Sequence, residues 1–247
     1  MQRYLLHISY DGTDFCGWQS QPDGRTVQQT IEKALSILAK QPITIFGSGR
    51  TDAGVHAIDQ TAHVDFPIQM EPQQIIRGLR SHLPMDVCVH HIEPVSGDFH
   101  ARYQAFRRTY RYRLCLERTP FNNRFCSFMP HRRICPETIA AVLPYFEGTH
   151  DFTSFSKFNP KIASTVCQMY QCTMENLDNE LQFTVSANRF LHHMVRRIVG
   201  TAVLIGHHKE SPKIIETLFE QKDPRNKLIA TAPPQGLYLL KVEYPQN

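Results

Sequence analysis

The chain has 247 residues, of which 41% are hydrophobic and 20% charged, and its formal net charge is +4. This length suits one large domain or two small ones with a packed core, and the mild basicity is compatible with a nucleic-acid partner without proving one. A membrane protein is excluded because no apolar run is long enough to cross a bilayer, and the amino-terminal residues lack the apolar core of a signal peptide.

The predicted elements of the first half follow the order β-α-β-β-α-β. The first helix begins at Thr26, a typical N-cap residue, and the second at Pro72, which suits the first turn of a helix. Residues 10–24 form a long loop that is rich in turn residues, and loops of this kind are often functional. Alternating apolar residues predict strands over residues 3–9, 43–47, 58–66 and 86–95, and helical spacing predicts helices over residues 26–40 and 72–82.

The second half repeats the same order. Its strands are predicted over residues 107–116, 165–175, 181–187 and 236–244, and its helices begin at residue 136 or cover residues 188–206 and 212–220. We therefore expect an α+β fold of two ferredoxin-like β-α-β-β-α-β halves, whose antiparallel sheets join around a central cleft with helices on the outer face. The predicted boundary near residues 97–103 gives two domains, residues 1–102 and 103–247.

One stretch, residues 47–57, has an unusual composition for a loop. Small residues and three glycines surround Arg50 and Asp52, directly after an apolar run. Glycines allow close approach of a ligand, and an arginine two residues away on the same extended face keeps a carboxylate ionised. Asp52 is therefore a candidate anion in an open site. A surface turn with a salt bridge explains the spacing equally well.

A short window of the chain mixes arginine with aromatic residues. Arg108, Tyr110 and Tyr112 alternate on one side of a predicted strand, which makes the two tyrosines core residues by pattern alone. The same mixture of guanidinium groups and rings is suited to RNA, and a base-stacking tyrosine has to line a cleft. The alternation leaves both interpretations open, as well as a simple solvated basic strand. The arginines of this window are Arg102, Arg107, Arg108, Arg111, Arg113 and Arg118.

The predicted helix over residues 188–206 has one apolar and one basic face. The basic face, which includes Arg196, could contact phosphates, although a solvated face is the commoner outcome. Its basic residues are Arg189, His192, His193, Arg196 and Arg197.

Metal and disulfide sites are not expected. Adjacent histidines such as His90 and His91 point to opposite faces of a strand, so they do not chelate naturally. The glycine-rich stretch lacks the lysine of a phosphate-binding loop. Seven scattered cysteines without a C-x-x-C motif indicate a reduced, cytoplasmic protein without a disulfide framework.

Several stretches together resemble the TruA type of tRNA pseudouridine synthase, in the family's order and over nearly the whole chain. The most specific is Gly49-Arg50-Thr51-Asp52-Ala53-Gly54-Val55-His56-Ala57. The others are the Tyr10–Gln21 loop, Thr26-Val27-Gln28, Phe99-His100-Ala101-Arg102, Tyr110-Arg111-Tyr112, Asp151–Phe155, Phe190–Gly200 and Gly236–Leu239.

The resemblance implies an isomerase that converts uridine to pseudouridine at positions 38, 39 and 40 of the tRNA anticodon stem-loop. It implies Asp52 as the catalytic nucleophile and Tyr110 as the residue that stacks on the target base. Arg50 would hold the carboxylate and a phosphate, and Arg196 would line a basic cleft. Leu237 and Leu239 would help to wall the site. The resemblance further implies a homodimer that uses no metal or cofactor.

One departure from the family pattern is visible at Thr165-Val166-Cys167, where members often carry arginine after Thr-Val. It puts a basic contact from that strand in doubt. Two other functions compete with the synthase. The first is a non-catalytic RNA-binding module in which Asp52 only orders a loop, and the second is a nucleotide hydrolase that uses the glycine-rich stretch.

Overall fold

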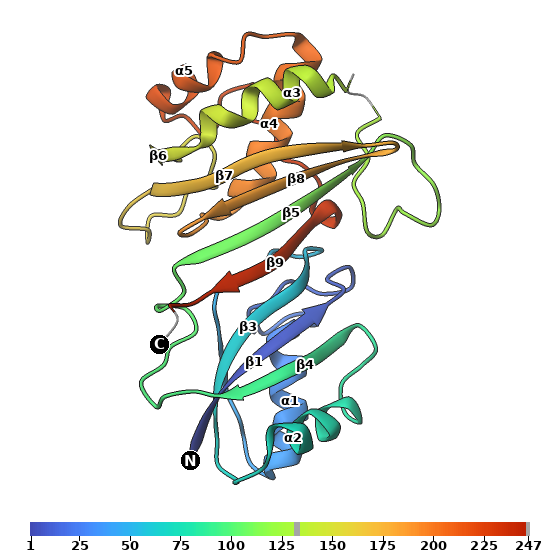
Figure 1. The fold of residues 1–247 in the computed structure, drawn as a ribbon, viewed down its shortest axis with the longest axis vertical. Helices are drawn as coiled ribbons and strands as arrows, with labels where there is room; N and C mark the ends of the chain where they lie inside the picture. The colour runs from blue at the N-terminus through green and yellow to red at the C-terminus, as the bar shows by residue number, and fades with distance from the viewer. Residues whose placement is uncertain (131–133, 246–247) are drawn as a thin grey trace. The chain divides into compact units, whose positions relative to one another are not determined.

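The structure is a computed structural model that describes residues 1–130 and 134–245. Residues 1–106, together with the chain from residue 238 onward, form one compact unit, and residues 107–237 form a second. Each unit pairs a sheet with helices, as Figure 1 shows. No helix of the described residues is long and apolar enough to cross a membrane.

Unit 1 is a mostly antiparallel sheet with two helices on one face (Figure 1). Strand β1 is paired on one edge with β4 and on the other with β3, both antiparallel. The other edge of β3 pairs with β2 as far as Ala62 and, nearer the amino end of β3, with the parallel strand β9 at His56 and Ala57. The elements are β1 (Gln2–Tyr10), α1 (Val27–Ala39), β2 (Ile45–Gly47), β3 (His56–Phe66), α2 (Pro72–Arg80), β4 (Val87–Pro94) and β9 (Leu237–Glu243).

Local sequence explains where the two helices of unit 1 begin and end. The Thr26 side chain accepts a hydrogen bond from the Gln29 amide, which caps α1, and Lys40 ends that helix in the left-handed conformation. Glu71 and Gln74 form a capping box at the start of α2. The apolar faces of both helices are buried, so unit 1 has its own core.

Unit 2 has four antiparallel strands in the order β5-β8-β7-β6. Its core contains phenylalanines in edge-to-face contact, among them Phe146 and Phe155 with ring centroids 5.0 Å apart. The elements are β5 (Arg107–Cys115), α3 (Pro136–Val142), η1 (Leu143–Phe146), β6 (Gly148–Asp151), β7 (Val166–Leu177), β8 (Glu180–Ala187), α4 (Met194–His208), α5 (Ile214–Gln221) and η2 (Pro234–Gly236).

The α+β fold class is confirmed, and two elements differ from prediction. The helix predicted from Asn188 begins only at Met194, because His193 adopts a left-handed backbone with φ of 64°. The Asn188 side chain also accepts hydrogen bonds from the Gln168 and Arg189 amides, which fixes an irregular segment ahead of the helix. Strand β6 was not predicted, because its four residues are too short for a hydrophobic period.

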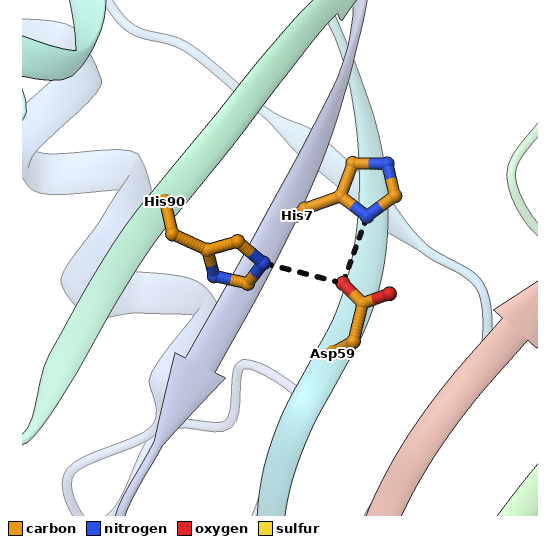
Figure 2. Close-up of side chains that lie close together, drawn as sticks. All are labelled: His7, Asp59 and His90. Atoms are coloured by element: carbon orange, nitrogen blue, oxygen red, sulfur yellow. Dashed lines mark hydrogen bonds and ion pairs between the residues drawn. The ribbon is translucent and has the colours of Figure 1, made fainter.

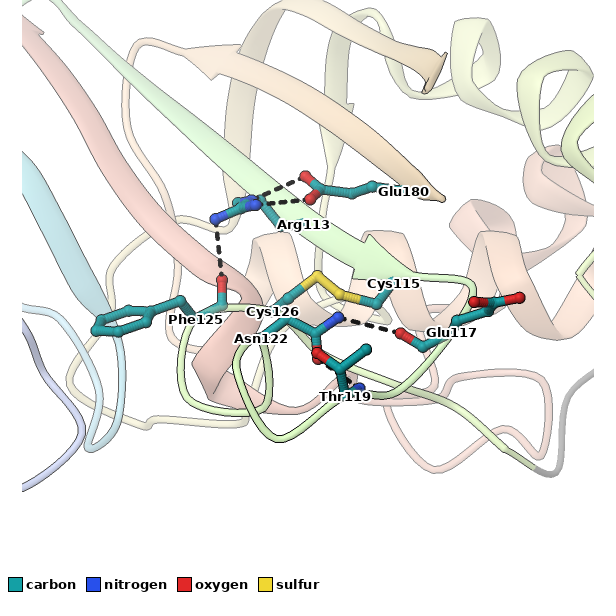
Figure 3. The surroundings of a disulfide bond; sticks show 8 residues. All are labelled: Arg113, Cys115, Glu117, Thr119, Asn122, Phe125, Cys126 and Glu180. Atoms are coloured by element: carbon teal, nitrogen blue, oxygen red, sulfur yellow. Dashed lines mark hydrogen bonds and ion pairs between the residues drawn. A yellow bond between two sulfur atoms is a disulfide. The ribbon is translucent and has the colours of Figure 1, made fainter. Parts of the chain in front are cut away.

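The absence of a disulfide was a wrong prediction, since Cys115 and Cys126 are bonded (Figure 3). The chain leaves β5 at Cys115 and returns alongside it at Ser127. The Cys115 amide donates to the Ser127 carbonyl at 2.8 Å, and the Ser127 amide donates to the Arg113 carbonyl at 3.0 Å. This backbone pairing, which no cysteine spacing reveals, brings the two thiols together.

Candidate active site

The loop that carries Asp52 connects β2 to β3, and its first residues are held by a buried glutamine. The Ser48 amide donates to the Thr61 carbonyl, and the Ser48 hydroxyl donates to Gln60 Oε1 at 2.6 Å. Gln60, which is fully buried, donates in turn to the Gly49 carbonyl. These bonds fix the direction in which the loop leaves β2. Nothing in the sequence marks Gln60 for this role except a polar residue within a buried strand.

Asp52 itself is half-buried at the start of a tight turn. Its carbonyl accepts a hydrogen bond from the Val55 amide at 3.2 Å, and Gly54 completes the turn with φ of 76°. A residue with a Cβ adopts that backbone conformation only with strain. Glycine at position 54 therefore shapes the turn that follows Asp52.

The second long loop, residues 11–18, lies against the Asp52 loop and supports it. The Trp18 amide donates to the Thr51 carbonyl at 3.1 Å, and the Tyr10 hydroxyl is 2.8 Å from Thr51 Oγ1. Close approach requires glycine, because a Cβ on Gly12 would lie 1.9 Å from the Val55 carbonyl oxygen. The motif stretches at residues 10–21 and 49–57, which are far apart in the sequence, therefore form one structure.

His56 is a further buried polar residue of this structure. The Gly12 amide donates to His56 Nδ1 at 3.1 Å, and the Asp11 carboxylate lies 3.2 Å from the same nitrogen. The imidazole stacks on the Tyr238 ring with centroids 4.7 Å apart. His56 thus ties the 11–18 loop and β9 to the start of β3. Sequence reasoning included His56 in a motif but assigned it no role.

The remaining predicted residues of unit 1 differ in exposure. The Arg50 side chain is exposed to solvent, where it is accessible to a ligand. Leu239 is 1% exposed and pairs with Ala57 in the ladder between β9 and β3. Arg50 therefore offers a positive charge at the surface, whereas Leu239 packs inside the unit.

Unit 2 contains the other predicted residues. Tyr110 is 9% exposed, and its ring meets Phe190 edge-on with centroids 5.0 Å apart. Leu237 is 5% exposed. Arg196 is half-buried, and its Nε donates to the Ala232 carbonyl at 2.7 Å. Both Tyr110 and Leu237 are therefore largely packed against protein, as alternation along the strand predicts for Tyr110.

The prediction of a basic helix face over residues 188–206 is wrong. Arg189, His192 and His193 precede the helix, so they do not share a face with its residues. Arg197 lies on α4, but its guanidinium donates to the carbonyls of Ser154, Ser156 and Pro224. Burial lowers the pKa of Arg197, which acts as a structural cross-link within unit 2.

The arginines of β5 also have partners within unit 2. Arg113 forms a two-pronged ion pair with Glu180 at 2.8 and 2.7 Å, as Figure 3 shows. Arg107 lies over the Tyr170 ring at 4.5 Å from its centroid. Arg113 and Arg107 therefore use their guanidinium groups for contacts within unit 2.

Comparison with known proteins identifies the family. The family profile described as tRNA pseudouridine synthase matches residues 7–104 and 142–245, which include the Asp52 loop. A protein of Latilactobacillus sakei named tRNA pseudouridine synthase A is 41% identical over 98% of this chain and 99% of its own length.

Two further relatives carry the same name. The Exiguobacterium protein is 37% identical over 99% of this chain and 98% of its own length. The Geobacillus protein is 41% identical over 98% of both chains. The chain therefore belongs to the tRNA pseudouridine synthase family, whose members are isomerases that act on uridine in tRNA.

Proposed function

We propose that this enzyme converts uridine to pseudouridine at positions 38, 39 and 40 of the tRNA anticodon stem-loop, with Asp52 as the nucleophile. One observation supports Asp52 above all. Asp52 is a half-buried residue on a loop that two other segments hold by backbone hydrogen bonds, in a chain of this family. A rigid loop of this kind suits a group that must meet a reacting atom.

The chemistry explains why a carboxylate suffices. The C1′–N1 bond of the nucleotide breaks, the base turns, and a C1′–C5 bond forms, while the C5 proton leaves and N1 gains one. Neither oxidation nor hydrolysis takes place, so we expect no cofactor. Ionised Asp52 forms a covalent bond that holds one fragment while the base turns, at C6 of the uracil or at C1′ of the ribose.

The substrate base must leave the stem before it reaches Asp52. Flipping costs a few kcal/mol, and stacking on an aromatic ring returns about 1–3 kcal/mol per base. We assign this stacking to Tyr110, and contacts with backbone phosphates to Arg50 and Arg196. Leu237 and Leu239 are proposed as apolar support. The assignment of Tyr110 rests on its place in the Tyr110-Arg111-Tyr112 stretch that resembles the family.

The proposed function also concerns how the chain is divided into halves, how it assembles and where it acts. We propose ferredoxin-like halves along the predicted division into residues 1–102 and 103–247, with the chain from residue 238 completing unit 1, a homodimer that shares one tRNA, and a cytoplasmic location. The element order β-α-β-β-α-β and the strand order β4-β1-β3-β2 of unit 1 support the first point. Sedimentation equilibrium of the pure protein tests the dimer, and a mass of one chain would refute it.

Asp52→Asn is the decisive variant, because it removes the charge and keeps the shape. We expect it to bind unmodified tRNA with wild-type affinity and to make no pseudouridine. Carbodiimide labelling followed by primer extension across the anticodon arm measures the product. Asp23→Asn changes an exposed aspartate outside the 47–57 loop that carries Asp52. It is the matched control, and we expect it to keep full activity. Pseudouridine at the wild-type rate in Asp52→Asn would end the nucleophile assignment.

The same experiment separates the competing functions. A binding module in which Asp52 only orders the loop predicts that Asp52→Asn changes nothing measurable. A nucleotide hydrolase predicts loss of activity in a chelator, whereas we expect pseudouridine formation to continue. The family assignment favours the isomerase over both.

A further inference from the structure

Three potential metal ligands converge on the helix-free face of the unit 1 sheet. They are His7 on β1, Asp59 on β3 and His90 on β4, as Figure 2 shows. One donor atom from each residue lies within 4.8 Å of those of the other two. The cluster uses none of the residues assigned to pseudouridine formation.

A β-bulge creates the cluster. His7 pairs with His91 across the β1–β4 ladder, but the next pair is Ile8 with Val89, so His90 is an extra residue. Such a bulge turns two consecutive side chains toward one side. The His90 and His91 rings accordingly lie 6.1 and 5.4 Å from the His7 ring. The prediction that adjacent histidines point to opposite faces is wrong at this position for that reason.

The spacing of the donor atoms fits a tetrahedral ion. Bond lengths of about 2.0–2.1 Å place neighbouring ligand atoms roughly 3.3 Å apart. The His90 Nε2 to Asp59 Oδ1 distance is 3.6 Å. The His7 Nδ1 to Asp59 Oδ1 distance is 2.8 Å, the length of a hydrogen bond that an ion would replace. These two distances lie on either side of the tetrahedral value, and all three donor atoms lie within 4.8 Å of one another.

A second carboxylate lies on the other side of the His7 ring, within the range of an ion pair. Glu93 Oε1 lies 3.6 Å from His7 Nε2. A proton on Nε2 that points toward Glu93 leaves the Nδ1 lone pair available to a metal, which is how outer carboxylates usually fix a ligating histidine. The His7 and Asp59 side chains are only 20% and 23% exposed, so they are held in place, whereas His90 at 42% leaves an entry path.

We propose that His7, Asp59 and His90 bind one late first-row divalent cation, of the Zn²⁺ or Co²⁺ type, with an open fourth position. Two imidazoles and one carboxylate suit this class of ion better than Mg²⁺ or Ca²⁺, which prefer all-oxygen ligands. Glu93 is the positioning residue of the site.

The test is titration of the full-length protein with Co²⁺ followed by absorption spectroscopy, and competition with Zn²⁺. Wild type should bind one ion per chain with no thiolate-to-cobalt band. His90→Gln should weaken binding more than Glu93→Gln, for which about a tenfold loss is expected. His82→Gln and Cys88→Ser change exposed residues outside the cluster and should leave affinity unchanged.

Circular dichroism of each variant checks that the fold is retained. Equal affinity of wild type and His90→Gln would overturn the proposal, as would a signal that disappears in Cys88→Ser. Absence of binding to wild type would also overturn it, and the cluster would then be an ion-pair network only. Pseudouridine formation does not enter this test, so its outcome is independent of the proposed function.

Discussion

The Cys115–Cys126 disulfide permits a prediction whose size follows from the structure. The two residues are 11 positions apart, so the bond closes a loop of about 12 residues. In the chain-entropy account, closing such a loop in the unfolded chain stabilises the folded state by about 3 kcal/mol at 25 °C. Reduction should therefore lower the stability of unit 2 by about this amount.

Urea unfolding with and without reductant measures the effect. Trp18 is the only tryptophan and lies in unit 1, so its fluorescence does not report on unit 2. Far-ultraviolet circular dichroism is the appropriate signal. We expect reductant to lower the urea midpoint of wild type and to leave unchanged that of the Cys115→Ser/Cys126→Ser double variant.

The double variant is the control because it has the same folded loop without the bond. The reasoning fails if wild type has one midpoint under both conditions while thiol titration shows that the bond was formed and then reduced. It also fails if reductant shifts the double variant equally, since the effect would then come from another cysteine.

Three further predictions concern stability. Gly12→Ala should destabilise the protein by about 1–3 kcal/mol in thermal unfolding, because its Cβ would overlap a backbone oxygen, whereas Gly49→Ala, with open space at its Cβ, should be near neutral; equal effects would contradict the close contact. Burial lowers the pKa of His63 to about 4, so protonation favours the unfolded state. About 2–3 kcal/mol of stability should be lost as pH falls from about 6.5 to 4, and a His63→Gln variant with the same pH profile would refute this. Burial acts to raise the pKa of Asp151, but hydrogen bonds, first that of Lys222 at 2.8 Å, lower it overall. Lys222→Met should cost about 1 kcal/mol near neutral pH and much less once acid protonates Asp151, and a loss independent of pH would argue against the ion pair.

Elements with a long hydrophobic period could be predicted from the sequence. The helix after Thr26 and the strand that ends at Phe66 are both present, because capping and alternation are local properties. The start of α4 could not be predicted, since the apolar spacing continues through residues 188–193 while His193 takes a left-handed backbone. The spacing of apolar residues predicts which side chains are buried, but it does not predict at which residue the backbone leaves a helix.

The candidate site shows the same division. The composition of the loop indicated Asp52, yet the support from Gly12 and Gln60 depends on contacts between segments distant in the sequence. The bulge at His90 is likewise a matter of register, which one strand alone does not contain. Local patterns therefore indicated the candidate carboxylate but not the contacts that hold its loop.

The pairing of β9 with β3 has a consequence for synthesis of the protein. Residues 238–244 complete unit 1, where Tyr238 stacks on His56 and the Tyr244 hydroxyl reaches Thr61 and the Ala101 carbonyl. A ribosome makes these residues only after the whole of unit 2. During synthesis, unit 1 therefore lacks the strand that pairs with β3 at His56 and Ala57 until residue 238 has been added, and a nascent chain that stops before that residue cannot complete the sheet of unit 1.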